Sequence, residues 1–200
     1  FSGEEGQLAI GSDSAILIGL GEDHATPQSL RGAGAKLVAA LHTMNASAAQ
    51  IEITKNLAGP LAKKIAVAAQ AIAEGIVLAN WRQESWRGTA ARGDVASGTL
   101  VLTSKDSAAR GGLRRGCILA DGANEARRLG STPPNIANPA WIAKQARSMA
   151  KRHGLSCSVI SAAKAKDLGM GGLTAVGMGS SSPPCLIHLK WKPKSVKSSE

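Results

Sequence analysis

Short apolar runs alternate with helix-period patterns along the first hundred residues, and this alternation constrains the fold more than any other feature. Residues 14–19 form an apolar run that closes on glycine, as a buried strand entering a tight turn does. Helices are predicted from Thr26-Pro27 through Leu41 and from Gly59-Pro60 to about Trp81, with apolar residues at helical spacing. Strands are predicted at 49–54 and 99–103. This order of elements predicts an α/β fold.

A proline pair divides the second half of the chain. A helix is predicted from Leu113 to about Leu129, with Arg127 and Arg128 near its negative C-terminal end. Pro133-Pro134 stops it, because proline lacks an amide hydrogen and disfavours helix in the residue before it, so we place a domain boundary there. The patterns that follow predict a helix from Asn138-Pro139 to about His153, a strand at 157–160, a short helix at 162–168, a strand at 185–191 and a polar end at 192–200.

Aromatic residues are scarce, with one Phe, four Trp and no Tyr in a chain that is 44% hydrophobic. Core packing must therefore rely on aliphatic side chains and on backbones that Ala and Gly bring close together, which favours helix packed against sheet. The three cysteines, Cys117, Cys157 and Cys185, are far apart and odd in number, which suits a reducing compartment and predicts buried thiols. Secretion and membrane insertion are not expected. Because residue 1 is Phe, the numbering is expected to begin inside a longer or processed polypeptide.

The net charge of +10 is unevenly distributed. Residues 101–200 hold 16 of the 24 Lys and Arg but only 5 of the 14 Asp and Glu. Such an excess suits a nucleic-acid surface, since Lys and Arg displace counterions from phosphates, and it also suits a chain whose acidic remainder lies elsewhere. The basic pairs lie on predicted helices, where paired charges usually form solvated faces or contacts between subunits; they are Arg114-Arg115, Arg127-Arg128 and Lys151-Arg152.

Two glycine-rich segments invite a phosphate-binding interpretation. Gly19-x-Gly21 lies between a predicted strand and a predicted helix, but His24 occupies the place of the third glycine of a dinucleotide fingerprint. Residues 169–180 could cradle an anion but lack the Gly-Lys-Ser/Thr ending of a phosphate loop. We therefore predict structural turns at both segments, with Met170 and Met178 as core fillers.

Metal-ligating and nucleophilic groups are sparse. The four histidines, His24, His42, His153 and His188, have no neighbouring ligands in sequence, and a two-metal hydrolytic centre needs more carboxylates than residues 101–200 hold. Asp121 and Glu125 are interpreted as one exposed turn of a helix. No Ser lies in a Gly-x-Ser-x-Gly elbow, so Ser180 and the cysteines are predicted to be structural.

The order of these segments resembles the leucyl (cytosol) aminopeptidase family across nearly the whole chain. Two stretches carry most of the resemblance: Asn-Glu-Ala-Arg-Arg-Leu-Gly-Ser-Thr-Pro-Pro-Asn at 124–135 and Leu-Gly-Met-Gly-Gly-Leu-Thr-Ala-Val-Gly-Met-Gly-Ser at 168–180. Residues 16–21, 26–31 and 74–79 match more weakly. Trp81 and Trp191 stand where the family usually has Tyr, and Met178 replaces a commonly polar residue.

The resemblance implies a macro-like N-terminal α/β domain at 1–112, a linker helix at 113–132 and the incomplete beginning of a catalytic domain at 133–200. It also implies a cytoplasmic hexamer in which two divalent metal ions, Zn or Mn, activate water to attack the N-terminal peptide bond of peptide substrates. The family's ligands, a Lys, several Asp and a Glu, lie in motifs downstream of the segment that matches Trp191. We therefore assign no catalytic, metal-binding or substrate-binding residue to this chain, and expect it to bind no metal and to be inactive by itself.

Two alternatives stay open at this stage. The chain could be a DNA-binding or assembly module of the same family, because the charge of residues 101–200 suits phosphate binding. It could also be a degenerate relative that is kept as a structural subunit. A salt-dependent gel shift addresses the first alternative.

Overall fold

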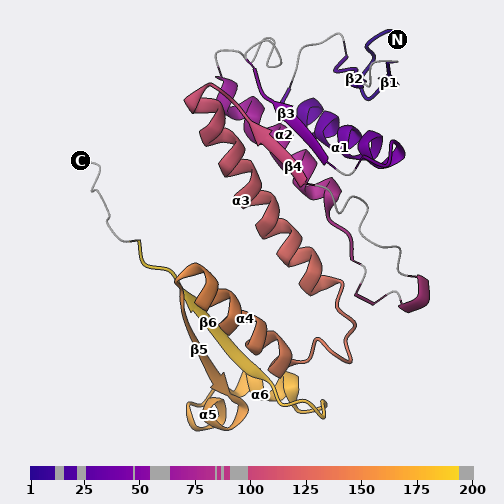
Figure 1. Ribbon diagram of the computed structural model, residues 1–200. Helices are drawn as coiled ribbons and strands as arrows, with labels where there is room; N and C mark the ends of the chain where they lie inside the picture. The colour runs from indigo at the N-terminus through magenta and orange to yellow at the C-terminus, as the bar shows by residue number, and fades with distance from the viewer. Residues whose placement is uncertain are drawn as a thin grey trace. The chain divides into compact units, whose positions relative to one another are not determined.

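The computed structural model describes residues 1–11, 16–21, 26–46, 48–54, 64–83, 85–86, 88–90 and 99–193 (Figure 1). The chain divides into two compact units, residues 1–131 and residues 132–200. Helices and strands alternate in both units, which confirms the predicted α/β class. None of the helices in the described ranges is long and apolar enough to cross a membrane.

In its described residues the first unit holds three α-helices and two small sheets. Its elements are β1 (Leu8–Ile10), β2 (Ile16–Ile18), α1 (Pro27–Thr43), β3 (Ala48–Glu52), α2 (Ile65–Asn80), a short 3-10 helix (Gly88–Ala90), β4 (Thr99–Thr103) and α3 (Ser107–Gly130). β1 and β2 pair antiparallel, whereas β3 and β4 pair parallel. The strand β1 was not predicted from the sequence, and the predicted helix start at Gly59-Pro60 lies outside the described residues.

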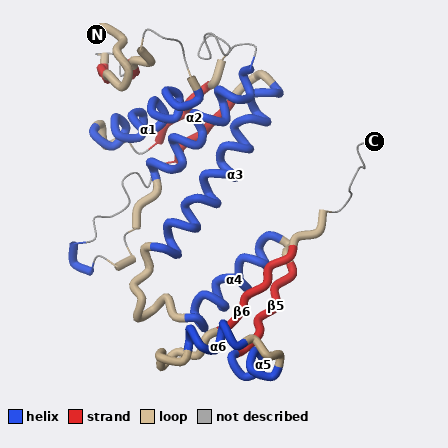
Figure 2. The backbone as a smooth tube through the Cα atoms, turned by 180° about the vertical axis from the view of Figure 1, so that it is seen from behind, coloured by secondary structure: helices blue, strands red, loops and turns tan. Residues whose placement is uncertain are grey.

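The parallel pair presents one face to the helices (Figure 2). Along β3 and just beyond it, Gln50 and Glu52 are exposed while Ile51 and Ile53 turn inward. Ile53, 1% exposed, joins a core that α1, α2 and the beginning of α3 complete; its other buried members are Leu30, Val38, Ile65, Ala68, Ala69, Ala71, Ile72, Ala73, Ile76, Ala109 and Leu113. The core is aliphatic, as the shortage of aromatic residues predicts.

Helix α1 begins where the sequence predicts. Thr26 is the N-cap, and its Oγ1 accepts a hydrogen bond from the Ser29 amide at 3.0 Å. The Ser29 hydroxyl in turn accepts from the Thr26 amide at 2.9 Å, which completes a capping box ahead of Pro27. Two of the amides that a helix start leaves without intrahelical partners are therefore satisfied locally.

Glycines allow the three helices of the first unit to approach closely. A Cβ atom added to Gly75 of α2 would lie 2.1 Å from the Arg31 carbonyl oxygen of α1. A Cβ atom added to Gly112 of α3 would lie 2.1 Å from the Ala66 carbonyl oxygen of α2. Helix α2 therefore packs between α1 and α3 with its backbone in close contact with the backbones of both. The predicted use of glycine in packing is confirmed, and these contacts join helix to helix rather than helix to sheet.

The long helix α3 starts six residues earlier than predicted. Its N-cap is Asp106, whose carboxylate accepts from the Ala108 amide at 2.8 Å and from the Ala109 amide at 3.0 Å. The predicted start at Leu113 lies just after the pair Gly111-Gly112, and glycine disfavours helix by intrinsic propensity. Packing of Gly112 on α2 outweighs that propensity.

The second unit packs one long helix against an antiparallel hairpin. Its elements are α4 (Pro139–His153), β5 (Ser156–Ser161), α5 (Ala162–Asp167), α6 (Gly171–Gly177) and β6 (Cys185–Lys190). Asn138 caps α4 by accepting from the Trp141 amide at 3.0 Å, and Gly154 ends it in the left-handed conformation. The buried face of α4 is made of three alanines, Ala143, Ala146 and Ala150.

Three predictions about single residues or segments of these units are wrong in whole or in part. Turns predicted within residues 169–180 are confirmed only next to Gly169 and at 178–179, because residues 171–177 form the helix α6. Met178 is not a core filler, since it is 83% exposed. The three cysteines are free and only half-buried, because each lies on an element with one side open to solvent.

Candidate functional site

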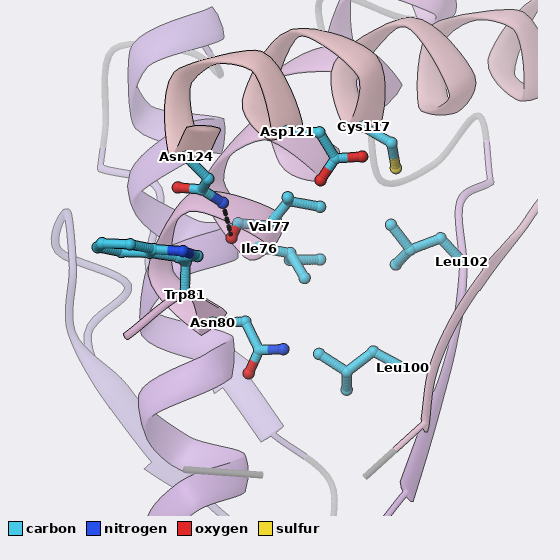
Figure 3. Close-up of a pocket in the computed structure, with 9 residues that line it drawn as sticks. All are labelled: Ile76, Val77, Asn80, Trp81, Leu100, Leu102, Cys117, Asp121 and Asn124. Atoms are coloured by element: carbon cyan, nitrogen blue, oxygen red, sulfur yellow. Dashed lines mark hydrogen bonds between the residues drawn. The ribbon is translucent and has the colours of Figure 1, made fainter. Parts of the chain in front are cut away.

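A cleft of about 550 Å³ opens in the first unit where three elements meet. The end of α2 contributes Ile76, Val77, Asn80 and Trp81, β4 contributes Leu100 and Leu102, and α3 contributes Cys117, Asp121 and Asn124 (Figure 3). The two leucines reach from the strand toward α2, while Asp121 and Cys117 enter from α3. The cleft therefore has an aliphatic wall, one aromatic side chain and a few polar groups, as small-molecule sites do.

Beside this cleft, side chains of α3 donate hydrogen bonds to carbonyls at the C-terminal end of α2. The Asn124 amide nitrogen donates to the Val77 carbonyl at 3.1 Å, and the Arg127 guanidinium donates to the Leu78 carbonyl at 2.9 Å. Both acceptors belong to the last turn of α2, where carbonyls have no partner within the helix. Arg127 also donates to the Asn124 side-chain oxygen at 2.8 Å and lies 4.4 Å from the centre of the Trp81 ring. Together these contacts form a clamp of Asn124, Arg127 and Trp81.

The clamp corrects the interpretation of one basic pair. Arg127 is exposed, but its charge caps α2 and covers Trp81 rather than only facing solvent. Arg128 pairs with Glu125 at 2.8 Å, so neither arginine of the pair is a bare surface charge. The signal that could have revealed this role is the spacing of Asn124 and Arg127, which places both on one face of a helix. From the sequence, Arg127 was predicted near the negative end of a helix and in a basic pair, without any contact to another helix.

Two polar side chains that line the cleft have acceptor oxygens for which the described residues provide no hydrogen-bond donor. The Asn80 Oδ1 atom is buried and has no hydrogen-bond partner in the described part of the chain. The Asp121 carboxylate is exposed, and it lines the cleft beside the Cys117 thiol. Burial raises the pKa of Cys117, and the charge of Asp121 raises it further. The neighbourhood of Cys117 is therefore electronegative, which favours a neutral thiol rather than a reactive thiolate.

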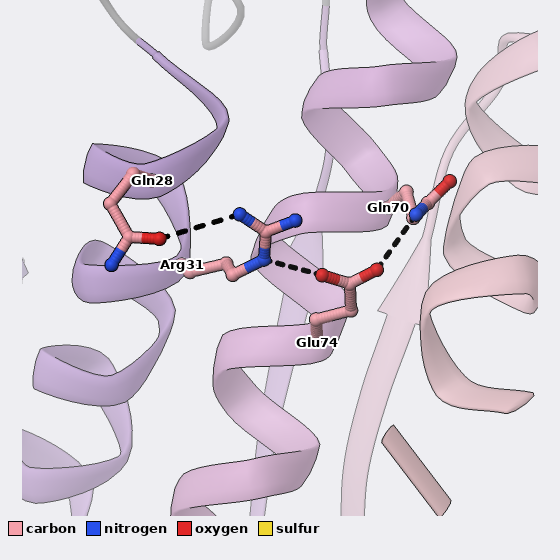
Figure 4. Close-up of polar contacts among 4 residues, drawn as sticks. All are labelled: Gln28, Arg31, Gln70 and Glu74. Atoms are coloured by element: carbon pink, nitrogen blue, oxygen red, sulfur yellow. Dashed lines mark hydrogen bonds and ion pairs between the residues drawn. The ribbon is translucent and has the colours of Figure 1, made fainter. Parts of the chain in front are cut away.

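A second polar group joins α1 to α2 away from the cleft. Arg31 of α1 donates to one carboxylate oxygen of Glu74 on α2, and Gln70 donates to the other at 2.7 Å (Figure 4). Gln28 accepts from Arg31 at 3.5 Å. Burial by itself raises the pKa of Glu74, but the hydrogen bonds from Gln70 and Arg31 and the charge of Arg31 bring the pKa below its usual value. Glu74 is thus a buried, fully partnered anion.

The segment Gly19-x-Gly21 is hydrogen-bonded to the N-terminal segment. The Gly19 amide donates to the Gln7 carbonyl at 2.8 Å, and the Gly21 amide donates to the Gly3 carbonyl at 3.0 Å. Because these two amides already donate to carbonyls of the N-terminal segment, they are not free to donate to a phosphate. The predicted turn stays a prediction, because residues 22–25, His24 among them, lie outside the described residues.

No group of three His, Cys, Asp or Glu side chains in the described residues could hold a metal ion. His42, His153 and His188 are exposed on separate elements. Asp121 and Glu125 occupy one turn of α3, as predicted, with Asp121 exposed and Glu125 half-buried. The described residues therefore do not fit a metal-ion centre, and no catalytic step is assigned to them.

Comparison with protein families gives two matches in chain order. Residues 6–89 match the N-terminal domain of the cytosol aminopeptidase family, and residues 124–200 match the catalytic domain of the same family. The chain belongs to the cytosol aminopeptidase family. Asn124 and Arg127, which begin the catalytic-domain match, are also the residues that clamp α2 of the N-terminal unit.

Relatives of known name agree with this family. The chain is 30% identical to the probable cytosol aminopeptidase of Aquifex aeolicus and 32% identical to that of Nitrosococcus oceani, with 96% of the chain aligned in each case. The aligned region covers 39% of the first protein and 40% of the second. The chain therefore spans about two fifths of the length of these relatives.

Solved structures share the fold. The bottromycin maturation enzyme BotP in complex with Mn superposes with a TM-score of 0.81 at 29% identity, over 97% of this chain and 41% of BotP. A variant of tomato leucine aminopeptidase gives the same TM-score at 24% identity, over 98% of this chain and 40% of the tomato chain. The tomato comparison supports the fold alone, whereas BotP is close enough in sequence to inform a functional proposal.

Proposed function

We propose that this chain is the front portion of a metal-dependent aminopeptidase that removes N-terminal residues, leucine among them, from peptides. The observation that carries the proposal is the pair of family matches in the order N-terminal domain, catalytic domain. Family members by name, including two relatives aligned over 96% of this chain, support the hydrolytic class.

The proposal includes two divalent metal ions, Zn or Mn, that activate water. The BotP structure in complex with Mn supports a metal requirement, since BotP shares this fold at 29% identity. The described residues offer no cluster of ligands for such ions. We therefore propose that the ligands belong to the part of a longer protein that these two fifths of the relatives' length do not cover.

The proposed setting of the enzyme is the cytoplasm, where the family name places its members. The proposed assembly is a homo-oligomer, a hexamer by family resemblance. Light scattering on the longer protein, made from the gene with its flanking sequence, should give about six times the mass of one chain. A monomeric mass would contradict the proposed assembly and would leave the proposed chemistry to be judged by activity.

Hydrolysis of leucine 4-nitroanilide by the longer protein tests the proposed reaction. We expect activity that a chelator abolishes and that Mn²⁺ or Zn²⁺ restores, because the attacking water requires the metal. The matched control substrate is the N-acetylated leucine amide, which lacks the free amine and should not be cleaved. Cleavage of both substrates at equal rates, or activity that survives full metal removal, would contradict the proposal.

A nucleic-acid-binding function rests on net charge alone. The basic residues of the described helices include Arg127 and Arg128, which are engaged in contacts with Leu78, Trp81 and Glu125. A gel shift at low salt with this chain would be the observation that revives this alternative.

A further inference from the structure

Helix α3 exposes large apolar side chains on the face opposite to the one that packs on α2. On its inner face, Gly112 and Gly116 lie against the backbone of α2 (Figure 1). On its outer face, Ile118 is 60% exposed and Leu119 is 48% exposed. Large aliphatic side chains in the middle of a solvent-facing helix indicate an interaction surface when they belong to a longer pattern on the same face.

The outer face carries such a pattern, which we call the α3 stripe. Its residues follow one another at alternating spacings of four and three, as do the positions that meet in a two-helix coiled coil. The first four are exposed and the last two are half-buried; in chain order they are Gly111, Arg115, Ile118, Gly122, Glu125 and Leu129. A Cβ atom added to Gly111 or Gly122 would meet nothing within 4 Å, so the space above both glycines is open.

The apolar residues of the α3 stripe fit a second copy of the same stripe that runs antiparallel. With the pair centred at position 120, Ile118 lies opposite Gly122 of the second copy, and Leu129 lies opposite Gly111 of the second copy. Two-fold symmetry repeats both contacts. Each large side chain therefore meets a glycine that leaves space for it, as close packing of two helices requires.

The charges match in the same register. Arg115 lies opposite Glu125 of the second copy, and symmetry makes this contact twice. Glu125 already accepts from Arg128 of its own helix at 2.8 Å, and a carboxylate can accept from a second guanidinium. A parallel pair in register would instead place arginine beside arginine and glycine beside glycine. The order of residues therefore selects the antiparallel arrangement.

We propose that the α3 stripe pairs antiparallel with the α3 stripe of a second copy of this chain. From Gly111 to Leu129 the stripe is about 27 Å long, at a rise of about 1.5 Å per residue. One helix pair of this length buries less than the roughly 1,200 Å² of a stable interface, so the dimer should be weak, with a Kd of about 10–100 μM. The pairing rests on this surface and not on the proposed peptide hydrolysis, so the two can fail separately.

Sedimentation equilibrium of the full chain from about 5 to 500 μM measures the pairing. Ile118→Asp should abolish the dimer and leave the circular dichroism spectrum unchanged, because Ile118 is already exposed in one chain. Arg115→Glu should raise the Kd about tenfold, and Glu125→Arg added to it should restore the affinity by exchanging the two charges. Lys151→Glu makes the same charge change at an exposed position of α4 and should have no effect.

Cysteine variants report the register of the pair. The background replaces the native thiols, Cys117, Cys157 and Cys185, with alanine. Mixed Gly111→Cys and Leu129→Cys chains should form a disulfide with each other under mild oxidation. Neither should cross-link to itself, because identical positions lie about 27 Å apart in the antiparallel pair.

Four results would overturn the proposal. They are a chain that stays monomeric at the highest concentration, equal effects of Lys151→Glu and Arg115→Glu, failure of the exchanged charges to restore the affinity, and self-cross-linking of Gly111→Cys. The last result would indicate a parallel pair or random collision instead.

Discussion

Arg127 shows how a residue can be recognised in sequence while its role stays hidden. Its place near the negative end of a helix was predicted from helix electrostatics and is confirmed. Its contacts with Leu78 and Trp81 were not predictable, because these residues lie about fifty positions earlier in the chain and only the packing of α3 on α2 brings them together. The same reason explains why the cleft lined by Asp121, Asn80 and Leu100 was not found from sequence patterns.

Replacing Arg127 should loosen the end of α2. Arg127→Ala removes a hydrogen bond to the Leu78 carbonyl and the contact with Trp81, so we expect a loss of about 1–2 kcal/mol in the free energy of unfolding. Arg115→Ala, an exposed arginine on the same helix, is the matched control and should change stability by less than about 0.5 kcal/mol. Urea unfolding gives both values. Equal losses in the two variants would mean that the clamp contributes nothing.

Glu74 should make stability depend on pH in the acid range. Its pKa is lower in the folded chain than the ordinary value of 4.5, so the folded state favours the ionised form. This contribution is present above the unfolded pKa and is lost as pH falls through the lower folded pKa. Wild type should therefore lose stability from about pH 5 downward more steeply than Glu74→Gln, which cannot ionise.

Urea midpoints measured across that pH range test the assignment of this slope to Glu74. Arg31→Gln keeps the carboxylate but removes its cationic partner, and it should flatten the same part of the profile. A Glu74→Gln profile that runs parallel to wild type would show that other carboxylates carry the acid sensitivity.

At the level of helices and strands, prediction succeeded where local chemistry decides the structure. The starts of α1 and α4 were predicted from Thr26-Pro27 and Asn138-Pro139, and the side chains of Thr26 and Asn138 cap them as expected. Prediction failed at the start of α3 and at α6, where glycines lower helix propensity. At α3, packing against α2 overrides that propensity, and this contact is invisible in a local pattern.

Adjacent glycines on α3 give a sharp test of the helix contact. Gly112→Ala would place a methyl group 2.1 Å from the Ala66 carbonyl oxygen, so we expect a loss of about 1–3 kcal/mol in stability. Gly111→Ala meets nothing within 4 Å and should stabilise the chain by about 0.5–1 kcal/mol through higher helix propensity. Thermal or urea unfolding distinguishes the opposite signs. A change of the same sign in both variants would contradict the close contact of α3 with α2.

At the scale of the whole molecule, the two units differ in how well they bury their apolar residues. The first unit has a continuous core around α2. In the second, Val176 is 91% exposed and Trp191 is 68% exposed, while the buried hydrophobic residues between 132 and 193 are four alanines, including Ala165. The family and the α/β class were predictable from motif order, but this imbalance was not, because burial depends on the assembled structure.

Hydrogen exchange should reveal the difference in apolar burial between the two units. Amides in the middle of α2 and α3 should exchange most slowly, since they lie in or beside the aliphatic core. Amides of α4, β5 and β6 should exchange faster in this chain, because little apolar area protects them. Mass spectrometry of peptides from each element measures both. Slower exchange in the second unit than in α2 would contradict this description of stability.

The most direct test of the central claim compares this chain with the longer protein in one assay of leucine 4-nitroanilide hydrolysis with added Mn²⁺ or Zn²⁺, alongside bound metal measured by mass spectrometry. The account predicts metal-dependent hydrolysis and about two bound ions per chain in the longer protein. For residues 1–200 alone it predicts neither activity nor stoichiometric metal, because the described residues hold no ligand cluster. Hydrolysis by residues 1–200, or a longer protein that is inactive with every metal, would contradict it.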